Sequence, residues 1–363
     1  MTFSSSQQPA SAVIGRLFIS LGVLALGAVA FRLSLRPMTA PEAANPAVKT
    51  FTQRDVLNGA QAVQINLNGD VADLDVGTAD LPGEALRGSL KLPGTVSRQA
   101  GRTEDTLNLT YTERARTAFT GDHMNLRLDR NGLHLDDAPN PPVGRWNLSL
   151  SRTVPTRLNL KLISGDIRLN LAGAALTALS LSSQTGDLQT TLPAALTGDV
   201  RLASTSGDLS ARFEGAAGAG SRNQTFSSTT RSGDQRLDLR QSGFGQVQIE
   251  SVSGDVNVTL PDRPGVRSAL KIATGDTNLI LGAQARSGSL TVTGVGGDLR
   301  LHVPPGLPVR VRTQRIVGDL NSPSDWVSQD GVYRSPTATE GQGALEVSLQ
   351  KVAGDVSIEE EGQ

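Results

Sequence analysis

The dipeptide Gly-Asp recurs along this chain at a nearly constant interval, and this interval constrains the fold more than any other feature. The occurrences that define this interval are Gly165 and Asp166, Gly186 and Asp187, Gly207 and Asp208, Gly233 and Asp234, Gly254 and Asp255, Gly275 and Asp276, Gly297 and Asp298, Gly318 and Asp319, and Gly354 and Asp355. Six of the eight steps between successive glycines are 21 or 22 residues, and the other two are 26 and 36. A fixed period of this length predicts a repeat architecture in which each repeat is one supersecondary unit.

Each repeat contains two runs in which apolar and polar residues alternate. After the first Gly-Asp, Ile167, Leu169 and Leu171 alternate with Arg168 and Asn170. A period of two places the apolar side chains on one face of a β-strand and the polar ones on the other. A second alternating run follows about 12 residues after each Gly-Asp, and Pro or Gly separates the runs. One repeat is therefore predicted to be strand, turn, strand, turn in about 21 residues.

Two short strands cannot bury an apolar face alone, so successive repeats must stack to form a core. The sequence predicts an all-β fold: a β-solenoid-like stack of two-strand Gly-Asp repeats around a narrow Leu, Val and Ile interior. Aromatic residues make up only 3% of the chain, which fits thin, regular strands. A propeller blade needs about 40 residues, and no segment of the repeat region has the apolar spacing of a helix.

The Gly-Asp pairs are interpreted as structural corners. Glycine supplies the positive φ that a sharp corner needs, and aspartate accepts backbone N–H groups in an Asx-type turn. The alternative is a ladder of carboxylates that binds calcium or performs acid–base chemistry. Calcium-binding solenoids use a Gly-Gly-x-Gly-x-Asp nonapeptide, which this chain lacks, and catalysis at every corner is not expected because active sites are few.

The N-terminus contains a targeting signal. Residues Leu17 to Phe31 form an uncharged apolar run of 15 residues that includes an Ala28-Val29-Ala30 cleavage pattern. A signal peptide and a single membrane anchor both fit this run. The predicted organisation is an anchor or signal peptide over 1–35, a linker over 36–50, an irregular β-rich capping region over 51–150, a repeat domain over 151–358, and an acidic tail over 359–363. The capping region contains a hairpin around Asn131 and Gly132.

The stretch 146–193 resembles the toast-rack domain of bacterial Lia-type cell-envelope stress proteins. The matching motifs are Val154-Pro155, the Gly-Asp at 165, the strand pair from Leu176 to Leu181, and the Gly-Asp at 186. The later "SVSGDVNVTLP" units are similar to the "putative adhesin" repeat domains of bacterial surface proteins. The resemblance covers roughly residues 56–358 and implies a solenoid-like envelope domain with no established enzyme activity. Lia-type proteins have several apolar segments at the N-terminus, whereas this chain has one.

Few residues are candidates for a site. There is no cysteine, so thiol catalysis, disulfides and cysteine-based zinc sites are ruled out. The charges of the 34 basic and 35 acidic residues nearly cancel, which argues against a nucleic-acid partner. His123, His134 and His302 have no neighbours at metal-ligand spacing, so we expect no metal, no cofactor and no catalytic residue. Trp326 and Tyr333 lie in the long insertion 321–343, where they either bind a partner or cap the core.

These features predict a non-catalytic cell-envelope protein that acts as an adhesin-like, scaffold or envelope-stress interaction module. A polysaccharide-active solenoid and a cation-binding solenoid are the alternatives. The expected partners are the membrane, through the N-terminal segment, and envelope proteins or polysaccharide. Self-association through the ends of the β-array is also expected. The domain is expected to lie outside the cytoplasm, with the acidic tail discouraging strand pairing at its C-terminal end.

Overall fold

The computed structural model describes residues 48–92, 94–114, 125–129, 132–136, 144–215, 223–338, 343–350 and 352–360. These residues form 28 strands and no helix, so none of the described elements is a helix able to cross a membrane. The predicted N-terminal anchor or signal peptide lies outside the described residues, as do His123 and nearly all of the linker.

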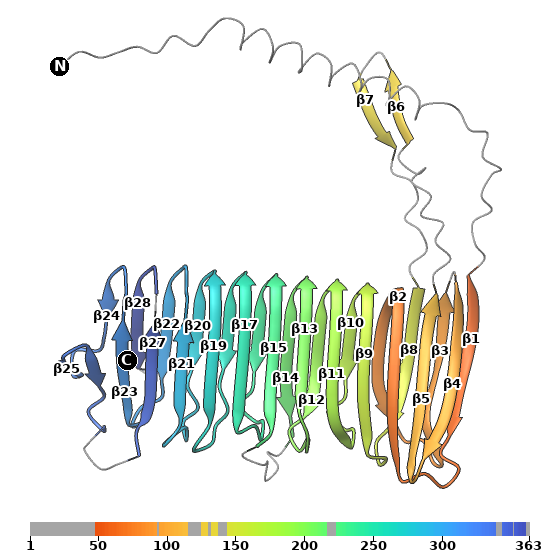
Figure 1. Ribbon diagram of the computed structural model, residues 1–363, viewed down its shortest axis with the longest axis horizontal. Helices are drawn as coiled ribbons and strands as arrows, with labels where there is room; N and C mark the ends of the chain where they lie inside the picture. The colour runs from red at the N-terminus through yellow and green to blue at the C-terminus, as the bar shows by residue number, and fades with distance from the viewer. Residues whose placement is uncertain are drawn as a thin grey trace, which may run out of the picture. The chain divides into compact units, whose positions relative to one another are not determined.

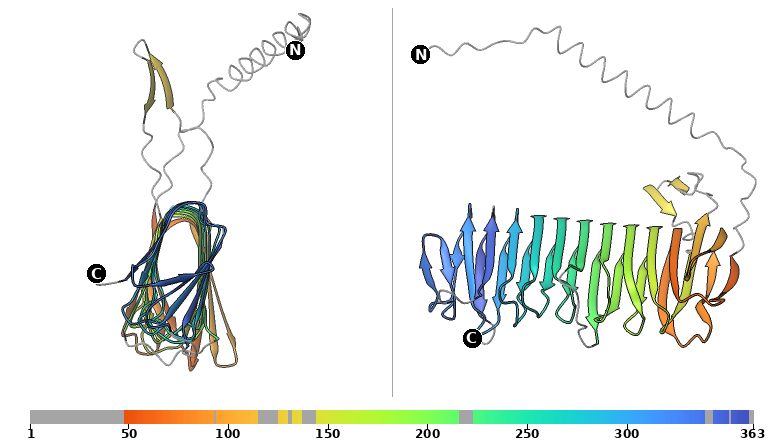
Figure 2. Two further views of the ribbon diagram at one scale, coloured as in Figure 1. Left: turned by 90° about the vertical axis from the view of Figure 1, so that its left-hand side faces the viewer. Right: turned by 60° about the horizontal axis from the view of Figure 1, so that its bottom comes forward.

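Two parallel sheets face each other along the whole array (Figures 1 and 2). Sheet I contains the strands that run toward the Gly-Asp corners, and sheet II contains those that run away from them. In spatial order sheet I holds β5 (Thr106–Arg114), the first half of β2 (Ala62–Ala79), β9 (Thr156–Ser164), β11 (Leu176–Thr185), β13 (Val200–Ser206), β15 (Thr225–Ser232), β17 (Gln246–Ser253), β19 (Arg267–Thr274), β21 (Ser289–Thr293), β27 (Leu345–Gln350) and β23 (Val309–Gln314). Sheet II holds β8 (Gly144–Ser151), the second half of β2, β10 (Ile167–Asn170), β12 (Leu188–Pro193), β14 (Leu209–Glu214), β16 (Gln235–Asp238), β18 (Val256–Thr259), β20 (Thr277–Ile280), β22 (Leu299–Val303), β28 (Val356–Glu360) and β24 (Leu320–Asn321).

One rung of the solenoid is a sheet I strand, a Gly-Asp corner and a sheet II strand. Successive rungs pair in register, so that Leu160 of β9 lies beside Leu181 of β11, which lies beside Leu202 of β13. Neighbouring strands in such a sheet lie about 4.8 Å apart. The predicted unit of strand, turn, strand, turn is confirmed.

The core lies between the two sheets and consists mainly of Leu, Val and Ile. Ile167, Leu169 and Leu171 are buried, whereas Arg168 and Asn170 are exposed, as the alternation predicts. The same pattern repeats in almost every rung. Where the turns are longest, Phe213, Phe226 and Phe244 fill the wider space with their rings packed edge to face or tilted.

The N-terminal end is closed by antiparallel strands. In sheet II, β3 (Glu84–Leu92) pairs with β8, and β1 (Lys49–Val56) pairs with β3. In sheet I, β4 (Thr95–Thr103) pairs with β5. Because β2 pairs in parallel with the repeat strands β9 and β10, and β5 and β8 pair in parallel with β2, the two-sheet array begins well before residue 151. The predicted hairpin is confirmed: β6 (Asn125–Asp129) pairs antiparallel with β7 (Gly132–Asp136), which contains His134.

The C-terminal end does not follow chain order. Strands β27 and β28, the last in the chain, lie between the rung of β21 and β22 and the rung of β23 and β24. The hairpin of β25 (Val327–Gln329) and β26 (Val332–Arg334) then covers the edge of β23. Glu359 and Glu360, which the sequence analysis assigns to the acidic tail, belong to β28, which pairs with β22 and, through Val356 and Ser357, with β24. Edge protection by the acidic end stays a prediction.

Candidate functional site

The Gly-Asp corners are the most regular polar feature of the molecule. Six of the glycines have φ between 114° and 122°, and Gly318 and Gly354 have φ of 141° and 153°; Gly297 is the exception. The neighbouring backbone also leaves no room for a side chain at these glycines. A Cβ on Gly254 would lie 2.3 Å from the carbonyl oxygen of Gly233 in the preceding rung. The corners therefore need glycine both for its conformation and for the close approach of the next backbone.

The aspartates of the corners form a hydrogen-bonded ladder. The backbone N–H of Asp255 donates to Oδ1 of Asp234 at 2.8 Å, and the N–H of Asp276 donates to Oδ1 of Asp255 at 2.9 Å. The same bond joins every adjacent pair of corners, at distances from 2.8 to 3.1 Å. In spatial order the ladder runs through Asp73, Asp166, Asp187, Asp208, Asp234, Asp255, Asp276, Asp298, Asp355 and Asp319.

This ladder corrects the predicted role of the aspartates. Each carboxylate before Asp319, the last of the ladder, does accept a backbone N–H, but the donor belongs to the next rung and not to a local Asx turn. The sequence reasoning also missed Asp73, because Ala72 stands there in place of glycine. The signal that identifies Asp73 is the run that follows it, in which Leu74 and Val76 alternate with Asp75 as in the other repeats.

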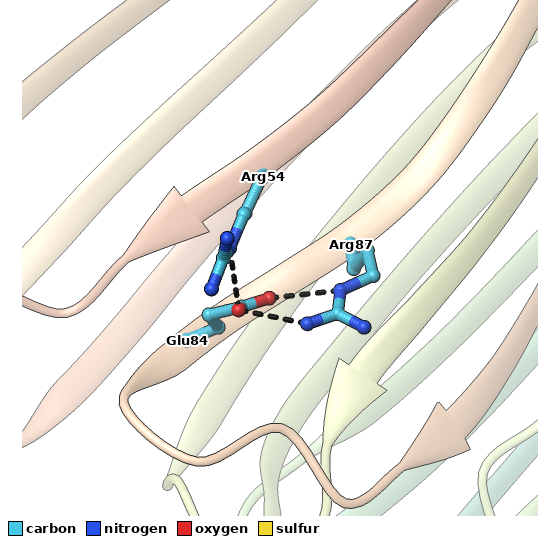
Figure 3. A network of polar contacts seen from close by, with 3 residues as sticks. All are labelled: Arg54, Glu84 and Arg87. Atoms are coloured by element: carbon cyan, nitrogen blue, oxygen red, sulfur yellow. Dashed lines mark hydrogen bonds and ion pairs between the residues drawn. The ribbon is translucent and has the colours of Figure 1, made fainter.

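A second polar cluster lies at the N-terminal end, where Arg54, Glu84 and Arg87 meet (Figure 3). Glu84 is buried, and its Oε1 lies 2.6 Å from Nε of Arg54 and 2.8 Å from Nη2 of Arg87. Arg54 and Arg87 face each other across β1 and β3, so one carboxylate joins two neighbouring strands. The hydrogen bond from Arg87 is the largest cause that lowers the pKa of Glu84, with Arg54 acting in the same direction and burial opposing both.

A third buried carboxylate contact at this end involves Asp55, which lies on the inner face of β1. Its Oδ1 accepts a hydrogen bond of 2.8 Å from Nε of Arg98 in β4, and its Oδ2 accepts one from the hydroxyl of Tyr111 in β5. The contact therefore joins sheet II to sheet I across the end of the core. Burial, together with the Asp55 carboxylate, raises the pKa of Tyr111 well above its ordinary value, so this phenol is a neutral donor. Both clusters hold the cap together.

The Glu84 cluster makes stability depend on pH. The folded-state pKa of Glu84 lies below its ordinary value of 4.5. Its ion pairs therefore contribute stability fully above pH 4.5, and this contribution is lost as the pH falls through the folded-state pKa. We expect Glu84→Gln to lower the midpoint of denaturant unfolding at pH 7 and to match the wild type in strong acid. Glu346→Gln, which removes an exposed pair with Arg310, is the control and should change little at either pH. An equal loss from Glu84→Gln at both pH values would contradict the assignment.

Trp326 and Tyr333 lie at the C-terminal end. Trp326 is 7% exposed, belongs to the core, and donates from Nε1 to Oε1 of Glu360 at 3.0 Å. Tyr333 in β26 is half-buried and packs against the same core. These positions favour the capping interpretation. Partner binding by the two residues stays a prediction, and it would require the indole to leave its buried position.

No metal centre is found within the described ranges, where no three His, Cys, Asp or Glu side chains lie close enough to hold an ion. Nδ1 of His302 lies 3.4 Å from Oε2 of Glu359 on the outer face of sheet II. Two shallow hollows, of about 520 and 240 Å³, lie on the outer face of sheet I. They are lined by polar side chains from several adjacent rungs, so the exposed face of this sheet is the remaining candidate for binding.

Family profiles match most of the chain. Residues 44–208 match the N-terminal domain of toast_rack (DUF2154), and residues 223–359 match toastrack DUF4097. The chain belongs to the toast-rack family. The two matched ranges meet near the loop between β14 and β15, yet both sheets of the toast-rack chain continue through this point. The sequence resemblance to toast-rack and adhesin-type repeat domains is thus confirmed.

Several solved structures are similar to this toast-rack chain. A "putative cell adhesion protein" from Clostridium sporogenes is 12% identical, with 87% of this chain and 100% of that chain covered and a TM-score of 0.32. A "putative adhesin" from Bacteroides fragilis is 11% identical, with 86% and 99% covered and a TM-score of 0.34. A "putative lipid binding protein" from Parabacteroides distasonis is 10% identical, with 86% and 97% covered and a TM-score of 0.33. No curated protein sequence matches the toast-rack chain.

Proposed function

We propose that this toast-rack chain is a non-catalytic cell-envelope protein whose solenoid acts as an adhesin-like or scaffold interaction module. The N-terminal apolar segment attaches or exports it, and the solenoid lies outside the cytoplasm. One observation carries the proposal: the strands of each sheet stack in register over the whole array and present two long outer faces of exposed polar side chains. Such extended surfaces are what solenoid proteins use to bind partners.

The closed ends support binding through the faces. Strands β1 and β4 cover one end and the β25–β26 hairpin covers sheet I at the other, while β24 is only two residues long. Capped and short edge strands are poor templates for pairing with another chain. Self-association through the ends stays a prediction, and this capping argues against it.

The polar clusters favour a structural role over catalysis. A catalytic centre usually perturbs the pKa of a titratable group in a cleft. Among the described residues, the shifted pKa values belong to Glu84, Arg87, Arg98 and Tyr111, and all four take part in contacts of the N-terminal cap. The corner carboxylates are occupied by backbone N–H groups of the next rung. Each cluster has a structural task that accounts for its residues.

In the test, the full-length chain, solubilised in detergent micelles, is mixed with washed envelope fragments of the bacterium that carries it. The fraction of the chain that sediments with the fragments is measured. We expect the chain to sediment with the fragments without releasing soluble sugar from them, and to do so equally in the presence of a chelator. Sugar release would favour the polysaccharide-active alternative. Melting that shifts with chelator would favour the cation-binding one. A chain that neither sediments nor releases sugar would leave the interaction module without support.

A further inference from the structure

The outer face of sheet I carries a strong excess of positive charge. Between β9 and β23, the basic side chains that point outward are Arg157, Lys161, Arg201, Arg231, Arg267, Lys271, Arg310 and Arg312. Within the strands the acidic ones are Glu250 and Glu346, while the exposed Asp199 directly precedes β13. Both are already neutralised, Glu250 by Lys271 at 3.0 Å and Glu346 by Arg310 at 3.4 Å. The six other basic groups form no ion pair within the described part of the chain.

The outer face of sheet II differs, although the same rungs build it. Its outward basic residues between β10 and β24 are Arg168, Arg212, Arg236 and Arg300, against the acidic Glu214, Asp238 and Glu359. Arg168 pairs with Asp166 at 2.8 Å, and Arg212 pairs with Glu214 at 3.0 Å. This face is close to neutral. The positive excess therefore belongs to one face and does not reflect the composition of the repeat.

The larger hollow on sheet I arises from the size of the outward side chains. On β9 and β13, Arg157 and Arg201 stand out from the sheet, whereas Ala178 and Ser180 of the intervening β11 are small. The result is a trough of about 520 Å³ between two guanidinium groups. Asp199 lies at one end of the lining, with its Oδ1 accepting the N–H of Thr225 at 2.9 Å.

The second hollow lies farther along the same face, over β17, β19 and β21, and its lining contains one arginine. Arg267 of β19 stands beside Ala269 of the same strand, with Gln248 of β17 and Thr291 of β21 on either side. Both hollows combine arginine with Ser, Thr, Asn or Gln, and the outward positions of the sheet I strands between β9 and β23 include no aromatic residue. The chemistry offered is the same in both places.

These groups match a ligand that bears both carboxylates and hydroxyls. A guanidinium presents a rigid fork of N–H donors that fits a carboxylate. Hydroxyl and amide side chains both donate and accept, which is what sugar hydroxyls require. Equivalent backbone positions recur about every 4.8 Å along the array, so an extended polymer lying across the strands would meet basic, hydroxyl and amide side chains at several points.

We propose that the outer face of sheet I binds an acidic polysaccharide, with Arg157, Arg201 and Arg267 pairing with its carboxylates and the Ser, Thr, Asn and Gln side chains holding its hydroxyls. This inference rests on the proposed interaction module and names its partner. An acidic peptide fits less well, because peptides add to open sheet edges and both ends of sheet I are covered. A flat membrane surface would leave the two troughs unfilled.

The experiment measures binding of polygalacturonate to the immobilised full-length chain at low salt. We expect binding that weakens as salt rises, since the charges are exposed. The double variant Arg157→Gln/Arg201→Gln should weaken binding about tenfold, because two exposed charge pairs are lost. The matched control is Arg236→Gln/Arg300→Gln, which removes the same charge from sheet II and should leave binding unchanged. Fully methyl-esterified polygalacturonate keeps the sugar backbone without the charge and should not bind.

Each contrary result overturns a specific step. Equal losses from the two double variants would show that total charge, and not this face, attracts the polymer. Equal binding of the methyl ester would remove the role of the arginines. Polyglutamate that binds as tightly as polygalacturonate, or phosphatidylglycerol vesicles that bind more tightly, would point to a peptide or a membrane. If envelope fragments retain the chain but the chain does not bind polygalacturonate, this inference is contradicted, while the proposed function keeps its support.

Discussion

Replacing Gly254 by alanine is expected to destabilise the solenoid by about 3 kcal/mol or more, although only one methyl group is added. The new Cβ would lie 2.3 Å from the carbonyl oxygen and 2.6 Å from the carbonyl carbon of Gly233. Both atoms belong to the backbone of the preceding rung, so no side chain can move aside to relieve the contact. The φ of 119° adds conformational strain for any residue with a Cβ. Backbone strain and overpacking at such a close contact are among the few mechanisms that reach this magnitude.

The measurement is denaturant unfolding combined with hydrogen exchange of the amides in β17 to β20. In a stacked array each rung depends on its neighbours, so exchange should rise around the altered corner before it rises elsewhere. Gly77→Ala is the control, because a Cβ added at Gly77, which lies in β2, would meet no atom within 4 Å and its φ is ordinary. We expect Gly77→Ala to stay within about 0.5 kcal/mol of the wild type. Similar losses from both variants would refute the close-approach argument.

The neighbouring aspartate gives a smaller effect in the same corner. Asp255→Ala removes the acceptor for the N–H of Asp276 and should cost about 1 kcal/mol, the usual net value of one hydrogen bond. Asp255→Asn keeps an oxygen at the same place and should be nearly neutral. The two changes are expected to leave binding intact, because the ladder lies on the corner edge and the proposed contacts lie on the outer face of sheet I.

The parts of this fold that the sequence predicts are those with a local cause. A corner needs glycine, a half-buried strand needs alternation, and both signals lie within a few residues of each other. Ile167, Leu169 and Leu171 are buried for this reason. The corner ladder was predicted only in part, because the partner of each aspartate lies in another rung, 21 or more residues away. Asp73 was missed because its corner uses Ala72 instead of glycine.

The cap and the order of the last rungs have no local signal. Arg98 and Tyr111 lie in one hairpin, but Asp55 precedes them by 43 and 56 residues, and nothing near Asp55 indicates either partner. The 36-residue step before Gly354 looks like an insertion within an ordinary repeat. Sequence spacing gives the length of such a step but not the neighbours of the strands that follow it. The positive charge on the outer face of sheet I likewise cannot be predicted from the sequence alone, because only the register of the strands shows that the arginines lie on one side.

Removing β27 and β28 is expected to detach the whole C-terminal end, although these strands are the last in the chain. A chain that ends at Ala338 loses the pair that lies between β21 and β23 in sheet I and between β22 and β24 in sheet II. The two strands also contribute the buried apolar side chains of Leu345, Val347, Leu349, Val356 and Ile358, each worth about 1.5–3 kcal/mol by burial. Trp326 loses its acceptor, Glu360.

The expected result is a split in hydrogen exchange at the position of the missing rung. Amides of β23 should exchange freely, whereas those of β17 to β20 should stay protected, because interactions in a solenoid are between neighbouring rungs. Removal of residues 361–363 alone leaves every described strand in place and is the control.

Protection that persists in β23 would mean that β23 and β24 repack directly on β21 and β22. That outcome is disfavoured by the side chains themselves: β27 places Leu349 beside Val292 in the core, and β23 would place the half-buried Thr313 there. The inserted strand pair therefore supplies apolar contacts that the end rung lacks, which is the physical reason for its position inside the array.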